Sequence, residues 1–377
     1  MRNFHVGIIG CGNIAETYAR MIPGFRGLRL VACSDVLPDR AAGMADRYRI
    51  AALSTEALLA SSEIDVIVNL TIPAEHFAVS QAALLAGKHV WTEKPLALSL
   101  KEARTLKKLA EERGLRVGSA PDTFLGGGHQ QARALLDQGK IGKVVSGCAA
   151  VLSHGMEGWH PNPDFFFRPG GGPIYDLGPY YIASLVDLIG PIARVAAFGS
   201  SGSPTRTIGS GPRTGEKVPV LTPTNVHAVL EFRGGAVISF SASWDVWAHR
   251  RTPIELYGEA GTLVLPDPND FDGIVSLAGR DGILQDQPVL LHVLGVANQS
   301  HPKWGPFANY RGAGLAEMVA ALDANRPHRC SMDLALHTVE VMAACLVSAD
   351  SGRSVPVESD CLRPAPLSDA EARMLMT

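Results

Sequence analysis

Residues Phe4–Ala15 read FHVGIIGCGNIA, and this stretch decides the fold. Its first half is apolar and rich in β-branched residues, which predicts a buried strand. Its second half has the pattern GxGxxA and leads directly into a helical stretch, Ile14–Met21. In such a pattern Gly10 permits a tight turn, Gly12 lets a ligand approach the backbone, and the final alanine keeps the helix close to the sheet. A glycine turn placed between a strand and a helix is typical of dinucleotide sites, where the helix N-terminus meets a pyrophosphate.

The segments that follow alternate between strands and helices. We expect further short strands over Leu28–Ser34, Asp65–Leu70 and Lys88–Thr92, with helical stretches between them. Near-continuous apolar runs suit parallel strands, because helices cover both faces of a parallel sheet. The sequence therefore predicts an α/β fold at the N-terminus, a doubly wound parallel sheet of the Rossmann type over residues 1–122.

A carboxylate stands at the end of the second expected strand. Asp35 lies 20 positions after Ala15, where a dinucleotide-binding fold places the acidic residue that bonds the adenosine ribose hydroxyls. Such a carboxylate repels a 2′-phosphate, so NAD is favoured over NADP. The structural alternative is that Asp35 caps a helix or a turn.

The ends of the other strands supply more candidates. In an open parallel sheet the ligand lies outside the carboxyl ends of the strands, so residues that directly follow strands are favoured for contact. Thr71 and Pro73 follow one strand, and Glu93 and Lys94 follow the next. With the glycine turn, the candidate cofactor contacts are Gly10, Gly12, Asn13, Ile14, Asp35, Thr71, Pro73, His76, Glu93 and Lys94.

Several motifs resemble those of one protein family. The stretch Gly87–Pro95 reads GKHVWTEKP and resembles the GKHV…EKP signature of the Gfo/Idh/MocA oxidoreductases. The glycine turn agrees with that family, Gly170–Gly178 (GGGPIYDLG) resembles its GGG…D.G motif, and Tyr310–Gly314 (YRGAG) resembles its late RG.G element. These motifs span nearly the whole chain in the family's order. The resemblance implies an NAD-dependent oxidoreductase that acts on a carbohydrate or a related polyhydroxylated molecule.

The resemblance gives Lys94 a chemical role. In the family the EKP lysine reaches the oxygen of the reacting carbon and the nicotinamide ribose, and it is assigned proton transfer. The chemistry is also plausible from the residue itself, since burial near a positively charged nicotinamide disfavours the ammonium and brings its pKa toward the working pH. The alternative is a solvated surface charge.

The chain departs from the family at one position. Many members have a histidine four residues after the aspartate of D.G.H, whereas this chain has Asp176, Gly178 and Tyr180. Asp176 and Tyr180 share a face if a helix starts near Asp176. Tyrosine titrates near a pH of about 10 and is a poorer free base than histidine, but beside Lys94 it can exchange a hydrogen bond with a substrate hydroxyl. The alternative is a packed ring whose hydroxyl bonds a carbonyl.

The pattern changes after about Ala120. Ala236–Trp244 alternates apolar residues with serines, as a half-buried antiparallel strand does, and Val226–Phe232 can pair with it through a glycine turn. We therefore expect an α+β domain over residues 123–377, built on a large, mainly antiparallel open sheet that serves substrate binding and oligomerisation as a homodimer or homotetramer. Helical patterns within Ala308–Asn325 and Met332–Ser351 can pack against either domain.

A polar and aromatic loop, residues 154–164, precedes the GGG motif, and such loops tend to carry function. A sugar site needs aromatic faces and forked polar groups, which this loop supplies. His160 is a candidate for the role of the missing family histidine, and Arg168 or Arg311 can bind an anionic substituent. Loop packing is the alternative for each. The catalytic candidates are Lys94, Asp176, Tyr180 and His160, and the substrate-binding candidates are Asp122, Thr123, Trp159, His160, Asn162, Arg168, Tyr180 and Arg311.

Composition excludes several classes of function. A net charge of -3 gives no basic field for nucleic acid. No uninterrupted apolar run approaches the roughly 20 residues of a membrane span, and no export signal is seen, so we expect a cytoplasmic protein. The six cysteines lack CxxC spacing and are expected to be reduced thiols. No zinc-binding pattern or GxSxG elbow is found, so we expect no metal and no serine hydrolase.

Three hypotheses about function follow. The leading one is hydride transfer between NAD and a secondary alcohol of a sugar, sugar derivative or cyclitol. The second is an NAD-dependent glycoside hydrolase, which works by transient oxidation, elimination and re-reduction. The third is an NAD-binding sensor or partner protein without catalysis, against which the presence of both Lys94 and Asp176 argues.

Overall fold

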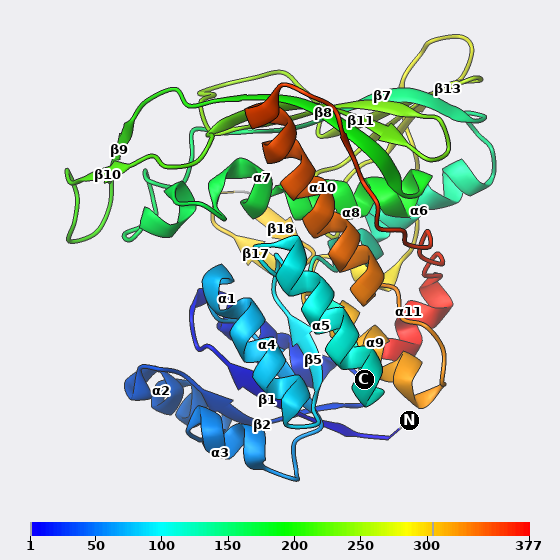
Figure 1. The fold of residues 1–377 in the computed structure, drawn as a ribbon. Coiled ribbons are helices and arrows are strands. Elements are labelled where there is room, and N and C mark those ends of the chain that lie inside the picture. The colour runs from blue at the N-terminus through cyan, green and yellow to red at the C-terminus, as the bar shows by residue number, and fades with distance from the viewer. Residues whose placement is uncertain (1, 304) are drawn as a thin grey trace.

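The computed structural model describes residues 2–303 and 305–377. In this part of the chain a parallel sheet lies at the bottom of Figure 1 and a large mixed sheet lies at the top. Helices α8 (Gly178–Ile189) and α10 (Met332–Ser351) lie between the two sheets (Figure 1). The predicted combination of a Rossmann sheet and a mainly antiparallel sheet is confirmed.

The parallel sheet has the strand order β3-β2-β1-β4-β5-β6, and all its neighbouring strands are parallel. Because the order reverses between β1 and β4, the crevice at their carboxyl ends is the expected ligand position. The strands are β1 (Phe4–Ile9), β2 (Leu28–Ser34), β3 (Ala51–Ala52), β4 (Val66–Asn69), β5 (His89–Thr92) and β6 (Val117–Ser119). The helices are α1 (Asn13–Met21), α2 (Pro38–Tyr48), α3 (Thr55–Ala60), α4 (His76–Leu85) and α5 (Leu100–Arg113).

Local sequence explains where α5 begins and ends. The Ser99 hydroxyl accepts the N–H of Glu102, and the Glu102 carboxylate accepts the N–H of Ser99, which makes a capping box. Gly114 ends the helix in the left-handed conformation. The helix buries Leu106 and packs on α4 and α10, and the segment before the capping box is the one that carries Lys94.

The mixed sheet has the strand order β16-β15-β14-β13-β7-β12-β11-β8-β19. Its neighbours are antiparallel except for β7 and β12. The predicted hairpin is present, with Ala228 opposite Phe240. The strands are β7 (Val144–Leu152), β8 (Ile192–Ser200), β11 (Asn225–Phe232), β12 (Val237–Ser243), β13 (Ile254–Gly258), β14 (Thr262–Leu265), β15 (Ser276–Ala278), β16 (Gln285–Asp286) and β19 (Val355–Pro356). Helices α8, α10 and α6 (Gly127–Asp137) lie on one face of this sheet (Figure 1).

The Gly-, Ser- and Pro-rich segment 201–223 leaves the mixed sheet and forms a small sheet of its own. Strands β9 (Thr205–Thr207) and β10 (Lys217–Pro219) pair antiparallel and project to one side of the molecule (Figure 1). The segment packs on a separate apolar cluster of Phe167, Ile208, Val218 and Trp244, which we call the satellite core. The segment is thus folded against the loop that precedes the GGG motif.

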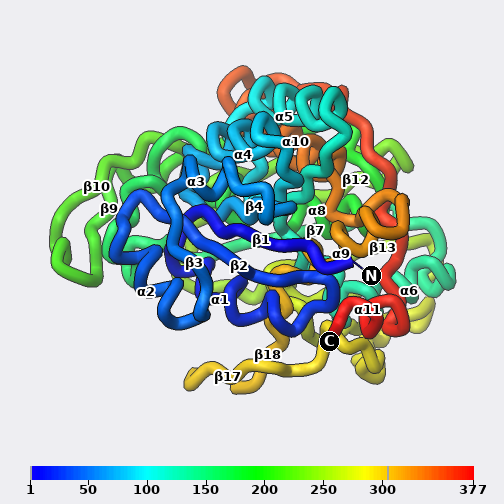
Figure 2. Tube along the Cα trace, turned by 90° about the horizontal axis from the view of Figure 1, so that it is seen from below, coloured from blue at the N-terminus to red at the C-terminus, as the bar shows by residue number. Residues whose placement is uncertain are grey.

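The C-terminal part of the chain returns to the parallel sheet. Helix α9 (Ala313–Asp323) contacts β6, while α10 contacts β6 and α5 as well as β8. The edge of β6 is covered by a bridge between Gly118 and Ser331, and α11 (Asp369–Leu375) is followed by a bridge between Met376 and Phe25. The two ends of the chain consequently lie close together in Figure 2. The hairpin of β17 (Gln299–His301) and β18 (Gly305–Phe307) is tied to α1 by a hydrogen bond from Arg20 to Gln299.

Helix α10 is long and apolar enough to cross a membrane by length and composition alone. However, 61% of its most apolar window is buried inside the protein. Its contacts with β8, α8 and α5 account for that burial. It therefore lies where a core helix lies.

Candidate active site

The glycine turn after β1 leaves room for a ligand in front of α1. Gly10 has a φ of +97°, and a Cβ atom there would lie 2.6 Å from the carbonyl oxygen of Leu70, so the turn needs glycine. A Cβ on Gly12 would meet nothing within 4 Å. Gly12 is also the N-cap of α1, where no side chain accepts from the first free N–H groups. Open space and free N–H groups at a helix N-terminus fit a pyrophosphate, and Asn13 and Ile14 begin that helix.

Asp35 is held beside this turn. One oxygen of its carboxylate accepts the N–H of Cys11 at 2.7 Å, and the other accepts the N–H of Leu37 at 2.8 Å. These two bonds fix the carboxylate at the end of β2. Since a carboxylate offers about four acceptor positions, it can still accept from a pair of ribose hydroxyls. The turn and Asp35 together fit the adenosine and pyrophosphate of NAD.

Three further cofactor candidates bond to neighbouring parts of the protein. Thr71 donates to the Asn69 side chain at 2.7 Å. His76 is 1% exposed, and its two ring nitrogens lie 2.6 Å from the Pro95 carbonyl oxygen and 3.0 Å from that of Thr71. Glu93 accepts from the Tyr18 hydroxyl and from the N–H of Lys94. His76 and Glu93 thus hold the loops after β4 and β5, which supports a positioning role for them.

An open cavity of about 200 Å³ lies between the ends of these strands and the GGG segment. The loop after β4, with Pro73, forms one side of it, and Lys94 and Pro95 follow from β5. The opposite side comes from the segment that precedes and includes α7 (Gly172–Asp176). On that side the lining residues are Phe165, Phe166, Arg168, Pro169, Gly170, Gly171, Tyr175 and Asp176.

Lys94 lines this cavity as one partner of an ion pair. Its Nζ donates to the Asp176 carboxylate at 2.7 Å and to the Asp176 carbonyl oxygen at 2.5 Å, and it lies 5.3 Å from the centre of the Tyr180 ring. Burial lowers the pKa of Lys94, as the sequence analysis expected, but the charges of Asp176 and Tyr180 outweigh burial and raise it above the ordinary value. The expected downward shift is therefore wrong for this structure, in which Lys94 is an ammonium.

Asp176 and Tyr180 approach Lys94 from two helices rather than one. Asp176 ends α7, the chain breaks its helical course at Leu177, and Tyr180 lies in the first turn of α8. The approach of α7 depends on Gly171, where a Cβ atom would lie 2.4 Å from the Phe166 carbonyl oxygen. The expected proximity of Asp176 and Tyr180 to Lys94 is present, although a shared helical face is not its cause.

Tyr180 has a second cation next to it. Burial lowers the pKa of Arg311, but the neighbouring Tyr180 hydroxyl raises it, and the net shift is upward. Arg311 also donates to the Asn269 side chain at 2.8 Å. The buried Tyr180 is thereby placed between Lys94 and Arg311. Arg311 acts on Tyr180 and does not line the cavity.

Asp122 and Thr123 are both buried and serve structure. The Asp122 carboxylate accepts the N–H groups of Gly312 and Gly314 at 2.9 and 3.0 Å, which fastens the RG.G segment. Burial raises the pKa of Asp122 to about 6, although these two bonds and Arg311 lower it. Thr123 donates to the Pro268 carbonyl oxygen at 2.6 Å. Neither side chain is among the lining residues of the cavity.

The loop over residues 154–164 also lies outside the cavity lining. Trp159 is 61% exposed, and the Asn162 side chain accepts from Arg213. The His160 ring packs on Phe165 and Phe166, and its Nδ1 accepts the N–H of Asn162. The structure does not bring Trp159, His160 or Asn162 to Lys94.

The aromatic wall of the cavity was not predicted from the sequence. Phe165 and Phe166 line it next to Arg168, and Tyr175 lines it while donating to the Leu98 carbonyl oxygen at 3.2 Å. The signal was present as three consecutive phenylalanines directly before the RPGGG stretch. Such a run is unusual in a loop unless the rings have a surface to cover.

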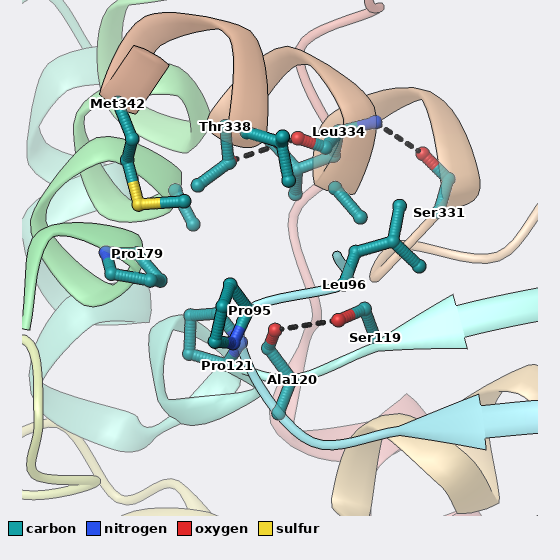
Figure 3. A pocket seen from close by; sticks show the side chains of 13 residues that line it. Pro95, Leu96, Ser119, Ala120, Pro121, Pro179, Ser331, Leu334, Thr338 and Met342 are labelled. Atoms are coloured by element: carbon teal, nitrogen blue, oxygen red, sulfur yellow. Dashed lines mark hydrogen bonds between the residues drawn. The ribbon is translucent and has the colours of Figure 1, made fainter. Parts of the chain in front are cut away.

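A second, much smaller cavity of about 10 Å³ lies beside Pro95 (Figure 3). Pro95, Pro121 and Pro179 face α10 across it, and Met342 closes one end. No charged side chain lines it, so it offers no acid or base. Within residues 2–303 and 305–377, no group of three or more His, Cys, Asp or Glu residues could hold a metal ion.

Comparisons with known proteins agree with this geometry. Residues 4–120 match the model of an oxidoreductase family with an NAD-binding Rossmann fold, and residues 129–264 match the GFO/IDH/MocA C-terminal domain. The fold and the site define an oxidoreductase that binds NAD through a Rossmann sheet. The chain belongs to the Gfo/Idh/MocA family.

Individual relatives are distant. A D-xylose dehydrogenase from Paenarthrobacter nicotinovorans is 23% identical over 83% of this chain and 83% of its own length. A glycosyl hydrolase family 109 protein from Streptomyces niveus is 25% identical over 81% of this chain and 62% of its own. The structure of levoglucosan dehydrogenase in complex with NADH superposes with a TM-score of 0.79 at 20% identity, covering 95% of this chain and 100% of that one. The last comparison shows the shared fold.

Proposed function

We propose that this protein is an NAD-dependent oxidoreductase that transfers a hydride between NAD and a secondary alcohol of a sugar, sugar derivative or cyclitol. The observation that carries the proposal is the Lys94–Asp176 pair, which lines a cavity at the strand ends next to a turn that fits NAD. The dehydrogenase and reductase names of distant relatives support the substrate class.

The residues at the cavity have different roles in the proposed reaction. NAD, when bound, accepts or returns the hydride. In the direction of reduction, the Lys94 ammonium donates a proton to the carbonyl oxygen of the substrate as it becomes an alcohol. In the direction of oxidation, the same nitrogen, once deprotonated, receives the hydroxyl proton. Asp176 orients the amine through its two hydrogen bonds, and Tyr180 can bond the same substrate oxygen.

A turnover screen tests this proposal. The purified protein is incubated with NAD and a panel of sugars, sugar acids, cyclitols and glycosides while NADH absorbance is followed. We expect stoichiometric NADH from at least one member of the panel. Tight NAD binding without turnover of any member would instead support a sensor or partner protein.

A second candidate function is an NAD-dependent glycoside hydrolase, which the glycosyl hydrolase family 109 relative favours. Such an enzyme releases an aglycone by transient oxidation, elimination and re-reduction, so NAD is not consumed. Release of aglycone from a glycoside with catalytic NAD and no accumulation of NADH would identify it. NADH formed in proportion to product identifies the dehydrogenase.

The contribution of Tyr180 is measured by Tyr180→Phe, which keeps the ring over Lys94 and removes the hydroxyl. We expect kcat to fall by about 10-fold if the hydroxyl only orients the substrate, and by about 10²-fold or more if it moves the proton. Tyr181→Phe is the matched control, because Tyr181 is buried under the mixed sheet and does not contact Lys94. Equal kcat for wild type and Tyr180→Phe would remove Tyr180 from the mechanism.

We also propose that the outer face of the mixed sheet joins two subunits. Phe198 is 79% exposed there, and Val229 and Val237, from neighbouring strands, are 47% and 43% exposed. An exposed apolar patch on a sheet is typical of a subunit contact. Light scattering should give a dimer or tetramer, and the double variant Phe198→Glu, Val229→Glu should give a monomer. Leu362→Glu, in an exposed segment outside the sheet, is the control, and a monomeric wild type would contradict this proposal.

A further inference from the structure

Arg168 is the unpaired cation of the cavity. It lines the cavity together with Lys94, and its side chain is exposed to the open space. Within the described residues its guanidinium has no hydrogen bond or ion pair, whereas Arg311 is engaged with Asn269 and Tyr180. Of the two arginines that the sequence offered for an anionic substituent, only Arg168 is therefore free to bind one.

The carboxylate nearest in sequence to Arg168 is already occupied. Asp164 accepts two hydrogen bonds from the guanidinium of Arg213, one at 2.5 Å and one at 3.1 Å. The pKa of Asp164 is lowered, mainly by Arg213 and only in a minor way by Arg168. Arg213, from the segment 201–223, therefore pairs with Asp164, and Arg168 remains an exposed lining residue of the cavity.

The charges that line the cavity add up to one positive charge. Lys94 and Asp176 neutralise each other as an ion pair, and Arg168 is the remaining charged lining residue. A single planar guanidinium matches a carboxylate bidentately, charge for charge. A phosphate carries about two negative charges and would be left partly uncompensated.

The rest of the wall suits the carbon skeleton of a sugar. Phe165 and Phe166 lie next to Arg168 and offer aromatic faces to C–H groups. Their rings are supported by contacts with His160 and with Trp244 of the satellite core. The segment 201–223 contacts this aromatic wall through the satellite core.

From this arrangement we propose that the substrate is a sugar acid, a polyhydroxylated molecule whose carboxylate binds Arg168 while its secondary alcohol lies at Lys94. The inference rests on the proposed oxidoreductase function and names the substrate class of that site. Arg168 is then the residue that selects for the acid over the neutral sugar.

Binding measurements test the proposal separately from turnover. The full-length enzyme is saturated with NADH, and glucuronate, glucose and glucose 6-phosphate are titrated in separate arms by calorimetry. Galacturonate and galactose form a second matched pair. We expect each uronate to bind roughly 10- to 100-fold more tightly than its neutral sugar, the range of a charge-assisted bond. Arg168→Gln should abolish this preference and change the affinity for neutral sugars by less than about 3-fold.

The controls separate the alternatives. Arg280→Gln, which removes an exposed arginine outside the cavity, should keep the preference of the wild type. Equal affinity of the wild type for acid and neutral sugars would overturn the proposal, as would an Arg168→Gln loss confined to NADH affinity or to glucose 6-phosphate. Arg168-dependent uronate binding without any turnover would support the anion site and contradict the oxidoreductase function instead.

Discussion

Lys94→Ala should reduce the rate of the chemical step by about 10²- to 10⁴-fold, the range of a positioned acid or base. The reason is that Lys94 lines the cavity, where its ammonium, oriented by Asp176, can donate a proton to the substrate. NADH affinity should stay within about 3-fold of the wild type, because the glycine turn and Asp35 lie on other strands.

Single-turnover kinetics with the substrate found by the screen measures the chemical step, and NADH fluorescence measures the affinity. Lys101→Ala removes an exposed lysine from the start of α5 and serves as the matched control. Near-normal turnover by Lys94→Ala would end the proposed mechanism and leave the fold and the family untouched.

NAD should bind at least about 100-fold more tightly than NADP. The Asp35 carboxylate is fixed by the N–H groups of Cys11 and Leu37, so it cannot swing away from a 2′-phosphate. Two like unit charges about 4 Å apart repel by about 4 kcal/mol at an effective dielectric constant of 20. Screening by salt at the protein surface reduces this repulsion but does not remove it.

Calorimetric titration measures the affinities for NAD and NADP and tests this prediction. Asp35→Ser, which removes the charge and keeps a hydrogen-bonding group, should bring the two affinities to within about 10-fold of each other. Asp39→Ser, on the exposed first turn of α2, is the control for a general change in surface charge. Equal affinities in the wild type would mean that Asp35 does not meet the ribose.

The fold was predictable from the sequence because its signals are local. The apolar strands that precede Gly10 and Asp35 and the alternating strand before Trp244 each follow a short-range periodicity, and the structure has strands at all three places. The family motifs gave the order of the remaining parts. The parallel pairing of β7 with β12 joins strands far apart in the sequence, so no local pattern predicts it.

The candidate site was predictable only in part, because its charges and walls depend on distant contacts. Lys94 and Asp176 could be named from motifs, but their ion pair, which reverses the shift in the pKa of Lys94, joins residues 82 positions apart. His160 and Phe165 are equally plausible in a polar and aromatic loop. The structure places Phe165 in the lining of the cavity and His160 outside it, a difference that the local sequence does not contain.

The cover on the edge of β6 has a consequence for synthesis on the ribosome. Cys330 and Ser331 supply that cover, with the N–H of Ser119 donating to the Cys330 carbonyl oxygen. They are translated about 200 residues after β6, which corresponds to roughly 10 to 40 s at ordinary elongation rates. During that interval the nascent Rossmann sheet exposes an open edge that a neighbouring chain can pair with. This edge of the cofactor domain therefore lacks its cover until the last eighth of the polypeptide emerges.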